Sequence, residues 1–209
     1  NFGESFSVKS IPEPNDLAYT SIALTPHTDN PYRKPIPCIQ LLHCLENEVK
    51  GGLSTLVDGF AVAEHLRKKH KDLFKILTKT KVRFRFVDKT IILENWGELI
   101  ELDENNKIKQ VRYSTRLDYV PALERKELET FYEARKLIAK LYASSKFEIK
   151  FKLERGDLLM MDNHRLLHGR TSYDVNDGKR YLKGCYIDHD STEGKLRHLE
   201  RKFGLKWKK

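Results

Sequence analysis

Apolar and polar side chains alternate along most of this chain in short stretches that are typical of β-strands. From Phe147 to Leu153 the alternation is strict, apolar against charged, which predicts a strand with one buried face. A turn at Gly156-Asp157 then leads into the apolar run 158–161, which predicts a buried strand. The expected strands are 17–21, 38–44, 54–57, 82–87, 108–113, 147–153, 157–161 and 180–188.

Helical periodicity interrupts these strands. Asp58 can cap a helix over about 60–69, followed by a shorter helical turn through Leu77. The longest predicted helix, opened by a proline, covers about 121–142 and has apolar residues at helical spacing, which we expect to be core contacts. A last helix is expected over about 193–201. Many strands with helical inserts predict a mainly β fold with α inserts, a jelly roll or double-stranded β-helix.

Length and cysteine content bound the class of protein. We expect residues 1–209 to form a single catalytic domain with a sizeable core, preceded by an N-terminal segment or domain because the chain starts at Asn1 without methionine. The three cysteines are odd in number and lie in apolar runs, which favours reduced, buried thiols in a cytoplasmic protein. No apolar run approaches the roughly 18 residues of a membrane span.

The chain is basic, with 39 Lys and Arg against 30 Asp and Glu and a formal net charge of +9. Such a charge can attract nucleic acid or a membrane surface. The lysines are scattered, however, and the densest clusters, 67–71 and 206–209, fall on helix-like or terminal segments, so we interpret the charge as a solvated face. We therefore expect a small-molecule substrate, with neither nucleic acid nor membrane as a partner, and leave a homo-oligomer open.

The most specific chemical signal is a set of two histidines and one aspartate. His27 and Asp29 lie between two prolines, where a helix is disfavoured, and on an extended segment their side chains point to the same side. With His168 arriving from far along the chain, they would form the ligand set of non-haem Fe(II) oxygenases, which leaves one face of the metal open.

The same spacing also occurs at His70 and Asp72, in a run that has the pattern of a helix. There the two side chains face apart, since residues two apart on a helix differ by roughly 200° in direction. This second match shows that spacing alone leaves a metal site and a chance match equally open.

The surrounding motifs favour the metal site. They resemble the γ-butyrobetaine and trimethyllysine hydroxylases, Fe(II)- and 2-oxoglutarate-dependent dioxygenases related to taurine dioxygenase, and they follow the family's order from Phe2 to about Leu199. The six matching segments are Tyr19–Tyr32, Gln40–Cys44, Gly51-Gly52, Val57–Phe60, Asn163–Arg170 and Gly184–Tyr186.

The resemblance implies a jelly roll that binds Fe(II) through His27, Asp29 and His168 and uses 2-oxoglutarate and O₂ as co-substrates. It assigns the 2-oxoglutarate carboxylate to Arg180, which shares a strand face with Leu182, Gly184 and Tyr186; we expect Gly184 to leave room beside this arginine. The rival is Arg170, which we expect on an exposed turn. The resemblance further implies roles in 2-oxoglutarate binding for Ser54, with Thr55 adjacent, and for Leu42. His164 replaces an aromatic residue, usually tryptophan, of many relatives, and its role stays open.

Relatives that act on trimethylammonium compounds hold the cation in an aromatic cage. The matching positions here are all aromatic: Phe2, Phe6, Tyr19 and Tyr186. Packing in a β-sheet core is the alternative explanation for these rings.

At the other end of the substrate, γ-butyrobetaine hydroxylases bind a carboxylate through an asparagine that this chain lacks. The corresponding stretch is Ser114-Thr115-Arg116, a more strongly anion-binding set that would suit a phosphonate analogue of a betaine. Arg116 could equally be a surface residue paired with Asp118.

These features lead to the hypothesis of a dioxygenase that hydroxylates a C–H bond of a small trimethylammonium acid. A taurine-like sulfonate dioxygenase, which needs no aromatic cage, is the alternative enzyme. A basic binding module with a vestigial site is the alternative of another class, although the intact ligand set argues against it.

Overall fold

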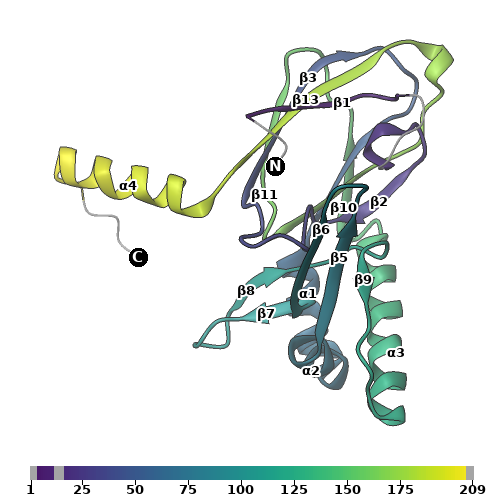
Figure 1. Ribbon diagram of the computed structural model, residues 1–209, viewed down its shortest axis with the longest axis vertical. Coiled ribbons are helices and arrows are strands. Elements are labelled where there is room, and N and C mark those ends of the chain that lie inside the picture. Colours follow the sequence, from purple (N-terminus) through teal and green to yellow (C-terminus); the bar gives the residue numbers. More distant parts are fainter. Residues whose placement is uncertain (1–3, 12–16, 206–209) are drawn as a thin grey trace.

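Two four-stranded antiparallel sheets form the upper half of the computed structural model, which describes residues 4–11 and 17–205 (Figure 1). The first sheet has the order β1-β13-β3-β11 and the second the order β10-β4-β12-β2. The strand bounds are β1 Phe6–Val8, β2 Leu24–His27, β3 Ile39–Asn47, β4 Ser54–Asp58, β10 Glu148–Phe151, β11 Leu158–Asp162, β12 Leu166–Arg170 and β13 Arg180–Ile187. From β1 to β4, and again from β10 to β13, successive strands alternate between the two sheets. This is the double-stranded β-helix, or jelly roll, that the pattern predicts.

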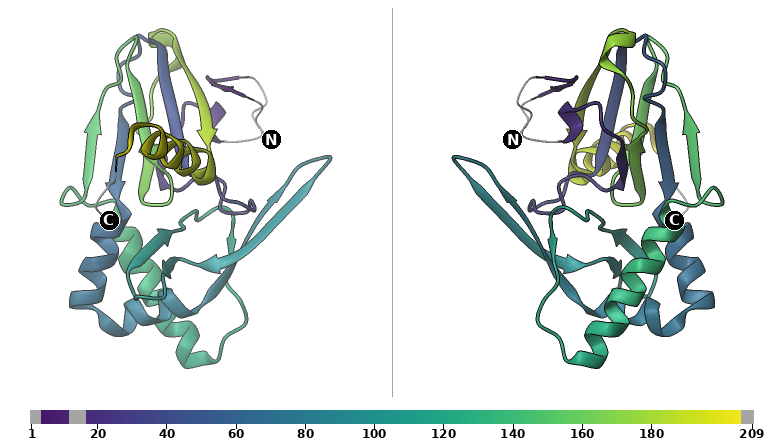
Figure 2. Two further views of the ribbon diagram at one scale, coloured as in Figure 1. Left: turned by 90° about the vertical axis from the view of Figure 1, so that its left-hand side faces the viewer. Right: turned by 90° about the vertical axis from the view of Figure 1, so that its right-hand side faces the viewer.

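A single insertion between β4 and β10 holds the remaining strands and all α-helices except the last one. It comprises α1 Gly59–Lys69, α2 Lys71–Lys79, β5 Lys81–Val87, β6 Ile92–Glu98, β7 Ile100–Leu102, β8 Ile108–Val111, β9 Asp118–Tyr119 and α3 Arg125–Tyr142. These elements lie below the sheets in Figure 1, and the β5–β6 hairpin projects to one side in Figure 2.

The larger apolar core belongs to this insertion. Its fully buried side chains include Leu66, Leu77, Phe131 and Ile138, joined by Leu167 of the jelly roll. A second, smaller cluster lies in the jelly roll itself and contains Cys44, Leu153 and Leu182. Because apolar packing is concentrated below, the interior of the jelly roll keeps room for a polar site.

The junction between β4 and α1 depends on Asp58. Its carboxylate accepts hydrogen bonds from the backbone N–H groups of Phe60 (3.0 Å) and Ala61 (3.2 Å), which caps the helix as expected. Arg165 donates to both oxygens of the same carboxylate. Gly59 permits the close approach, since a Cβ there would lie 2.7 Å from the carbonyl oxygen of Arg165.

The expected strand at 17–21 is wrong, because Leu17–Tyr19 form a short 3-10 helix, η1. The carbonyls of Thr20 and Ile22 accept hydrogen bonds from the Arg170 guanidinium (2.7 and 2.8 Å) instead of pairing with a strand. The Thr20 hydroxyl also accepts from the N–H of Ile22. A distant arginine therefore overrides the local preference.

Helix boundaries also differ from the pattern. Helix α3 was expected to begin at Pro121. It begins four residues later, at Arg125, and residues 121–124 are not helical. The expected turn through Leu77 is the full helix α2. The last helix, α4, is longer than predicted, at His189–Phe203.

Helix α4 extends away from both sheets (Figure 1) and buries none of its residues. It ends at Gly204, which adopts the left-handed conformation (φ 63°) that suits a helix C-terminus. None of the helices described is both long and apolar enough to cross a bilayer. All three cysteines are free, with Cys38 and Cys44 buried and Cys185 half-buried.

Candidate metal centre and its cavity

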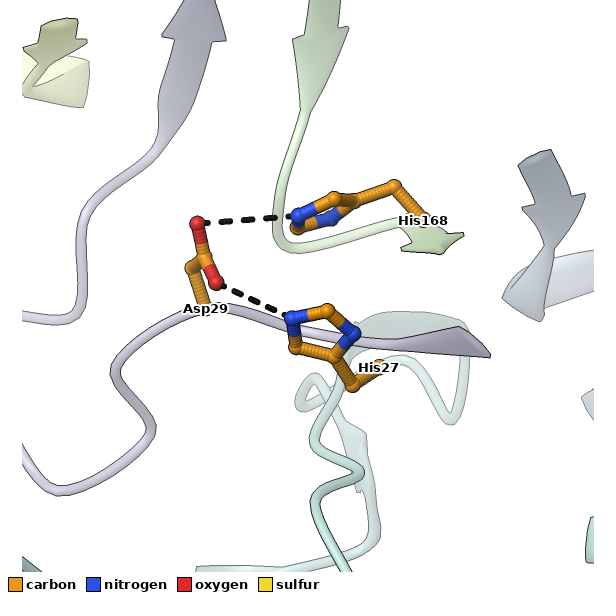
Figure 3. Close-up of side chains that lie close together, drawn as sticks. All are labelled: His27, Asp29 and His168. Carbon is orange, nitrogen blue, oxygen red and sulfur yellow. Dashed lines mark ion pairs between the residues drawn. The ribbon is translucent and has the colours of Figure 1, made fainter. Parts of the chain in front are cut away.

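Two neighbouring strands of the second sheet bring the predicted ligands together. Strands β2 and β12 pair with His27 opposite His168, so the two imidazole rings lie 4.4 Å apart. Asp29 follows two residues after the end of β2, with Oδ1 at 3.3 Å from His27 Nε2 and Oδ2 at 3.7 Å from His168 Nε2 (Figure 3). One ligand atom from each residue lies within 4.8 Å of the other two. The His70 and Asp72 pair takes part in no such group among the described residues.

The hydrogen bonds and charges around the three groups suit a divalent metal. A carbonyl can only accept, so His27 Nδ1 donates to the carbonyl of Thr25 (3.0 Å), and Nε2 is the ring nitrogen that faces Asp29. Burial lowers the pKa of His168 to about 4, against the opposing effect of Asp29, which leaves a neutral imidazole. Burial raises the pKa of Asp29, but His168, His27 and Tyr186 outweigh this effect and hold it well below its usual range. Two imidazoles and one carboxylate fit Fe(II).

The Asp29 carboxylate is held by further hydrogen bonds. Its Oδ2 accepts from the Tyr186 hydroxyl (2.6 Å) and from Gln40 Nε2 (2.7 Å). The Asp29 backbone N–H donates to Asn163 Oδ1 (2.7 Å), and Asn163 Nδ2 donates back to the Asp29 carbonyl (3.0 Å). With Oδ2 occupied by two protein donors, Oδ1 is the oxygen left for a metal.

A cavity of about 640 Å³ opens from the three ligands. Of the four arginines that line it, Arg170 and Arg180 are buried, whereas Arg33 and Arg116 are more exposed. Burial, and then the charge of Arg170, lowers the pKa of Arg180 to about 10. Arg180 Nε has no hydrogen-bond partner among the described residues, and no ion pair joins either guanidinium to a described carboxylate. A buried cation without a counter-charge is costly, so this cavity suits an anionic ligand.

Arg170 differs from our expectation of an exposed turn. It is the last residue of β12, only 5% exposed, and its guanidinium donates to the carbonyls around η1. Both Nη atoms of Arg170 therefore bind the cavity wall, and of the two buried guanidinium groups we expect Arg180 to be the one that binds a ligand.

Comparisons with known proteins show the family of this chain. The family model described as "Taurine catabolism dioxygenase TauD, TfdA family" matches residues 1–186. The chain belongs to the TauD, TfdA family.

Curated relatives of this TauD, TfdA chain have substrates in their names. It is 34% identical over 201 residues to a gamma-butyrobetaine dioxygenase of Pseudomonas sp. (strain AK-1), covering 96% of this chain and 52% of that protein. It is 33% identical over 204 residues to a trimethyllysine dioxygenase of Meyerozyma guilliermondii, covering 95% and 50%. The chain thus spans about half the length of the curated relatives it matches.

A solved structure supports the fold. The structure of asparagine oxygenase in complex with Fe(II), 3-hydroxyasparagine and succinate superposes with a TM-score of 0.69 at 16% identity, covering 88% of this chain and 56% of that one. The jelly roll is therefore shared at low sequence identity.

The cavity of this family member contains nearly all the predicted site residues that the structure describes. They are Phe6, Tyr19, His27, Asp29, Leu42, Ser54, Ser114, Arg116, His168, Arg180 and Tyr186. Phe2 lies outside the described residues. Thr55 and Thr115, the neighbours of Ser54 and Ser114, do not line the cavity.

Two local expectations are corrected. Gly184 makes room for Phe6 rather than for Arg180, since a Cβ there would lie 2.4 Å from the Phe6 ring. The close glycine beside Arg180 is Gly52, whose Cβ position would be 3.1 Å from Nε.

The alternative pairing of Arg116 with Asp118 is also corrected. Asp118 forms its ion pair with Arg135 instead (2.7 Å), while Arg116 lines the cavity.

Sequence reasoning missed Gln40, and it named Tyr186 only for its ring. Gln40 begins the matching segment Gln40–Cys44. It lies opposite Tyr186 across the paired strands β3 and β13, and both side chains donate to Asp29 Oδ2. The Gln40 contact joins residues 11 positions apart, and the Tyr186 contact joins residues 157 apart. Neither follows from local periodicity.

Proposed function

We propose that this chain is a single catalytic domain of an Fe(II)- and 2-oxoglutarate-dependent dioxygenase, which hydroxylates a C–H bond of a small trimethylammonium acid. The observation that carries the proposal is the buried guanidinium of Arg180, without a carboxylate partner in the described chain, in the same cavity as the His27, Asp29 and His168 group. A 2-oxo dicarboxylate satisfies both features, because one end chelates a metal and the other needs a cation.

His27, Asp29 and His168 would hold Fe(II), which supplies the activation of O₂ that couples decarboxylation of 2-oxoglutarate to substrate hydroxylation. Arg180 binds the far carboxylate through its two-pronged guanidinium. Ser54, buried on β4, offers its hydroxyl to the same carboxylate. Leu42 supplies an apolar wall that helps to exclude water from the co-substrate.

The substrate cation is assigned to aromatic rings near the metal. Phe6 and Tyr186 are stacked with centroids 5.1 Å apart, and Tyr19 lines the same cavity. Phe2 would complete this cage. Aromatic faces attract quaternary ammonium groups through cation–π interaction, and the relatives named for γ-butyrobetaine and trimethyllysine are consistent with such a ligand.

The anionic end of the substrate is assigned to Ser114 and Arg116. The Ser114 hydroxyl is buried in the cavity, at 2% exposure, and has no hydrogen-bond partner among the described residues. Arg116 lines the cavity from a more exposed position. A hydroxyl beside a guanidinium suits a phosphonate at least as well as a carboxylate.

Succinate release from 2-oxoglutarate tests the proposal when it is measured across γ-butyrobetaine, its phosphonate analogue, trimethyllysine, taurine and the primary-amine counterpart of γ-butyrobetaine. We expect substrate-dependent succinate with the trimethylammonium acids and a weaker response to the primary amine. Preference for taurine would replace the proposal by a sulfonate dioxygenase. No succinate with any compound would favour a binding module.

A further inference from the structure

A second group of metal-ligating side chains lies outside the cavity. Cys38, Asp162 and His189 each place one ligand atom within 4.8 Å of the other two. They come from three separate segments, namely the residue before β3, the last residue of β11 and the first residue of α4. None of the three lines the cavity of the first site.

A chain of hydrogen bonds determines the tautomer of His189. His164 Nε2 lies 3.2 Å from the carbonyl oxygen of Ile36, which can only accept, so Nε2 carries the proton and Nδ1 does not. His164 Nδ1 lies 3.1 Å from His189 Nε2, so the Nε2–H of His189 donates this hydrogen bond and His164 Nδ1 accepts it. The lone pair of His189 is thereby left on Nδ1. Metal-binding histidines commonly donate their other N–H to such a partner.

The surroundings of the sulfur are acidic. Burial, and then the negative charges of Asp162, Asp188 and Glu193, raise the pKa of the Cys38 thiol to about 12. A divalent cation bound at this place would offset the negative charge of the three carboxylates. Thiolate, imidazole and carboxylate together are typical ligands of Zn²⁺.

We propose that Cys38, Asp162 and His189 form a zinc site, with His164 as the positioning residue behind His189. Zinc bond lengths of about 2.0–2.3 Å place tetrahedral ligand atoms roughly 3.3–3.8 Å apart, so a small closure of the group completes the geometry. Water takes the fourth position.

This site would tie α4 to the body of the protein. Helix α4 buries none of its residues, so its apolar packing does not fix its direction. Asp162 directly precedes Asn163, which holds the backbone of Asp29. Zinc would therefore join α4 to the same turn that positions the first metal centre.

Cobalt titration of the full chain tests the proposal in a His27→Ala/His168→Ala background, which removes the first metal centre. We expect one equivalent of Co²⁺ to bind with a sulfur-to-cobalt charge-transfer absorption, and Zn²⁺ to displace it. Cys38→Ser should abolish this absorption. His189→Ala and Asp162→Asn should weaken binding at least tenfold, and His164→Ala by roughly 10–100-fold.

Matched controls keep the test decisive. Cys185→Ser removes another free thiol, and His198→Ala removes another exposed histidine of α4, so both should bind Co²⁺ like the parent. Because His189 is exposed, its replacement leaves the fold intact even if Cys38→Ser does not fold. Absence of the absorption in the parent, or its loss in Cys185→Ser, would overturn the proposal. The double histidine background separates this outcome from any failure of the dioxygenase assignment.

Discussion

Replacement of Tyr186 by phenylalanine separates two roles that one side chain combines. The Tyr186 hydroxyl donates to Asp29 Oδ2 at 2.6 Å, and its ring stacks on Phe6. Tyr186→Phe removes the first contact and keeps the second. Loss of an outer partner of a metal ligand costs roughly 10–100-fold in metal affinity.

The second donor to Asp29 Oδ2, Gln40, limits the expected loss of metal affinity. It still donates to the same oxygen at 2.7 Å, so the carboxylate keeps one of its two donors. We therefore expect Tyr186→Phe to weaken Fe(II) binding by roughly tenfold, which corresponds to about 1.4 kcal/mol. The preference for a trimethylammonium substrate over the primary amine should be unchanged, whereas Tyr186→Leu should lose both.

Anaerobic Fe(II) titration and competition kinetics measure the two effects independently. Tyr181→Phe is the matched control. Tyr181 lies on the same strand, but its hydroxyl forms a hydrogen bond with the Ser7 hydroxyl (3.1 Å) and not with Asp29. Unchanged Fe(II) affinity in Tyr186→Phe, with a reduced preference for the methylated substrate, would refute this division of roles.

Three further predictions concern the metal ligands, the substrate anion site and the α1 cap. His27→Ala, Asp29→Ala or His168→Ala should each abolish substrate-dependent succinate formation and Fe(II) binding, while His70→Ala should be silent in both assays. Arg116→Ala should erase any advantage of the phosphonate analogue over γ-butyrobetaine in kcat/KM; an unaffected ratio would exclude Arg116 from the anion site. Asp58→Ala should lower the free energy of unfolding by about 1–2 kcal/mol in urea titrations at neutral pH. Burial raises the pKa of Asp58, but Arg165 and the helix N–H groups outweigh this effect and hold the folded pKa below its usual value. The difference in unfolding free energy should therefore shrink as the pH falls through that lowered pKa. A difference that grew in acid would contradict this prediction.

The sequence was sufficient for features that depend on local pattern. The alternation from Phe147 to Leu153 predicted β10, although the strand is shorter, at Glu148–Phe151, and Ile149 on its expected buried face is exposed. The apolar run 158–161 is the strand β11, but the prediction that it is buried is wrong, because Leu158 and Met160 are exposed. The spacing of His27 and Asp29 predicted side chains that converge, and the motif around His168 identified their partner. Such features repeat with the period of a strand or lie within a few residues of each other.

Features that depend on distant contacts could not be predicted in this way. The buried Arg170 donates to the carbonyls of Thr20 and Ile22, just after η1, about 150 residues earlier in the chain. The space beside Gly184 is filled by Phe6 from β1, a strand of only three residues that gave no clear signal. The segment 17–21 has a strand-like composition, but its carbonyls bind Arg170 and Tyr173, which lie about 150 residues later in the chain.

Binding of 2-oxoglutarate, measured by calorimetry under anaerobic conditions, tests the central claim most directly. That claim is that the three ligands and Arg180 form one site. We expect one molecule of 2-oxoglutarate to bind per chain when Fe(II) is present, and binding to weaken sharply without the metal. Arg180→Lys should weaken it at least tenfold, because a point charge replaces a two-pronged donor, whereas the Fe(II) affinity should be retained. Equal affinity with and without Fe(II), or an unchanged affinity in Arg180→Lys, would contradict the account.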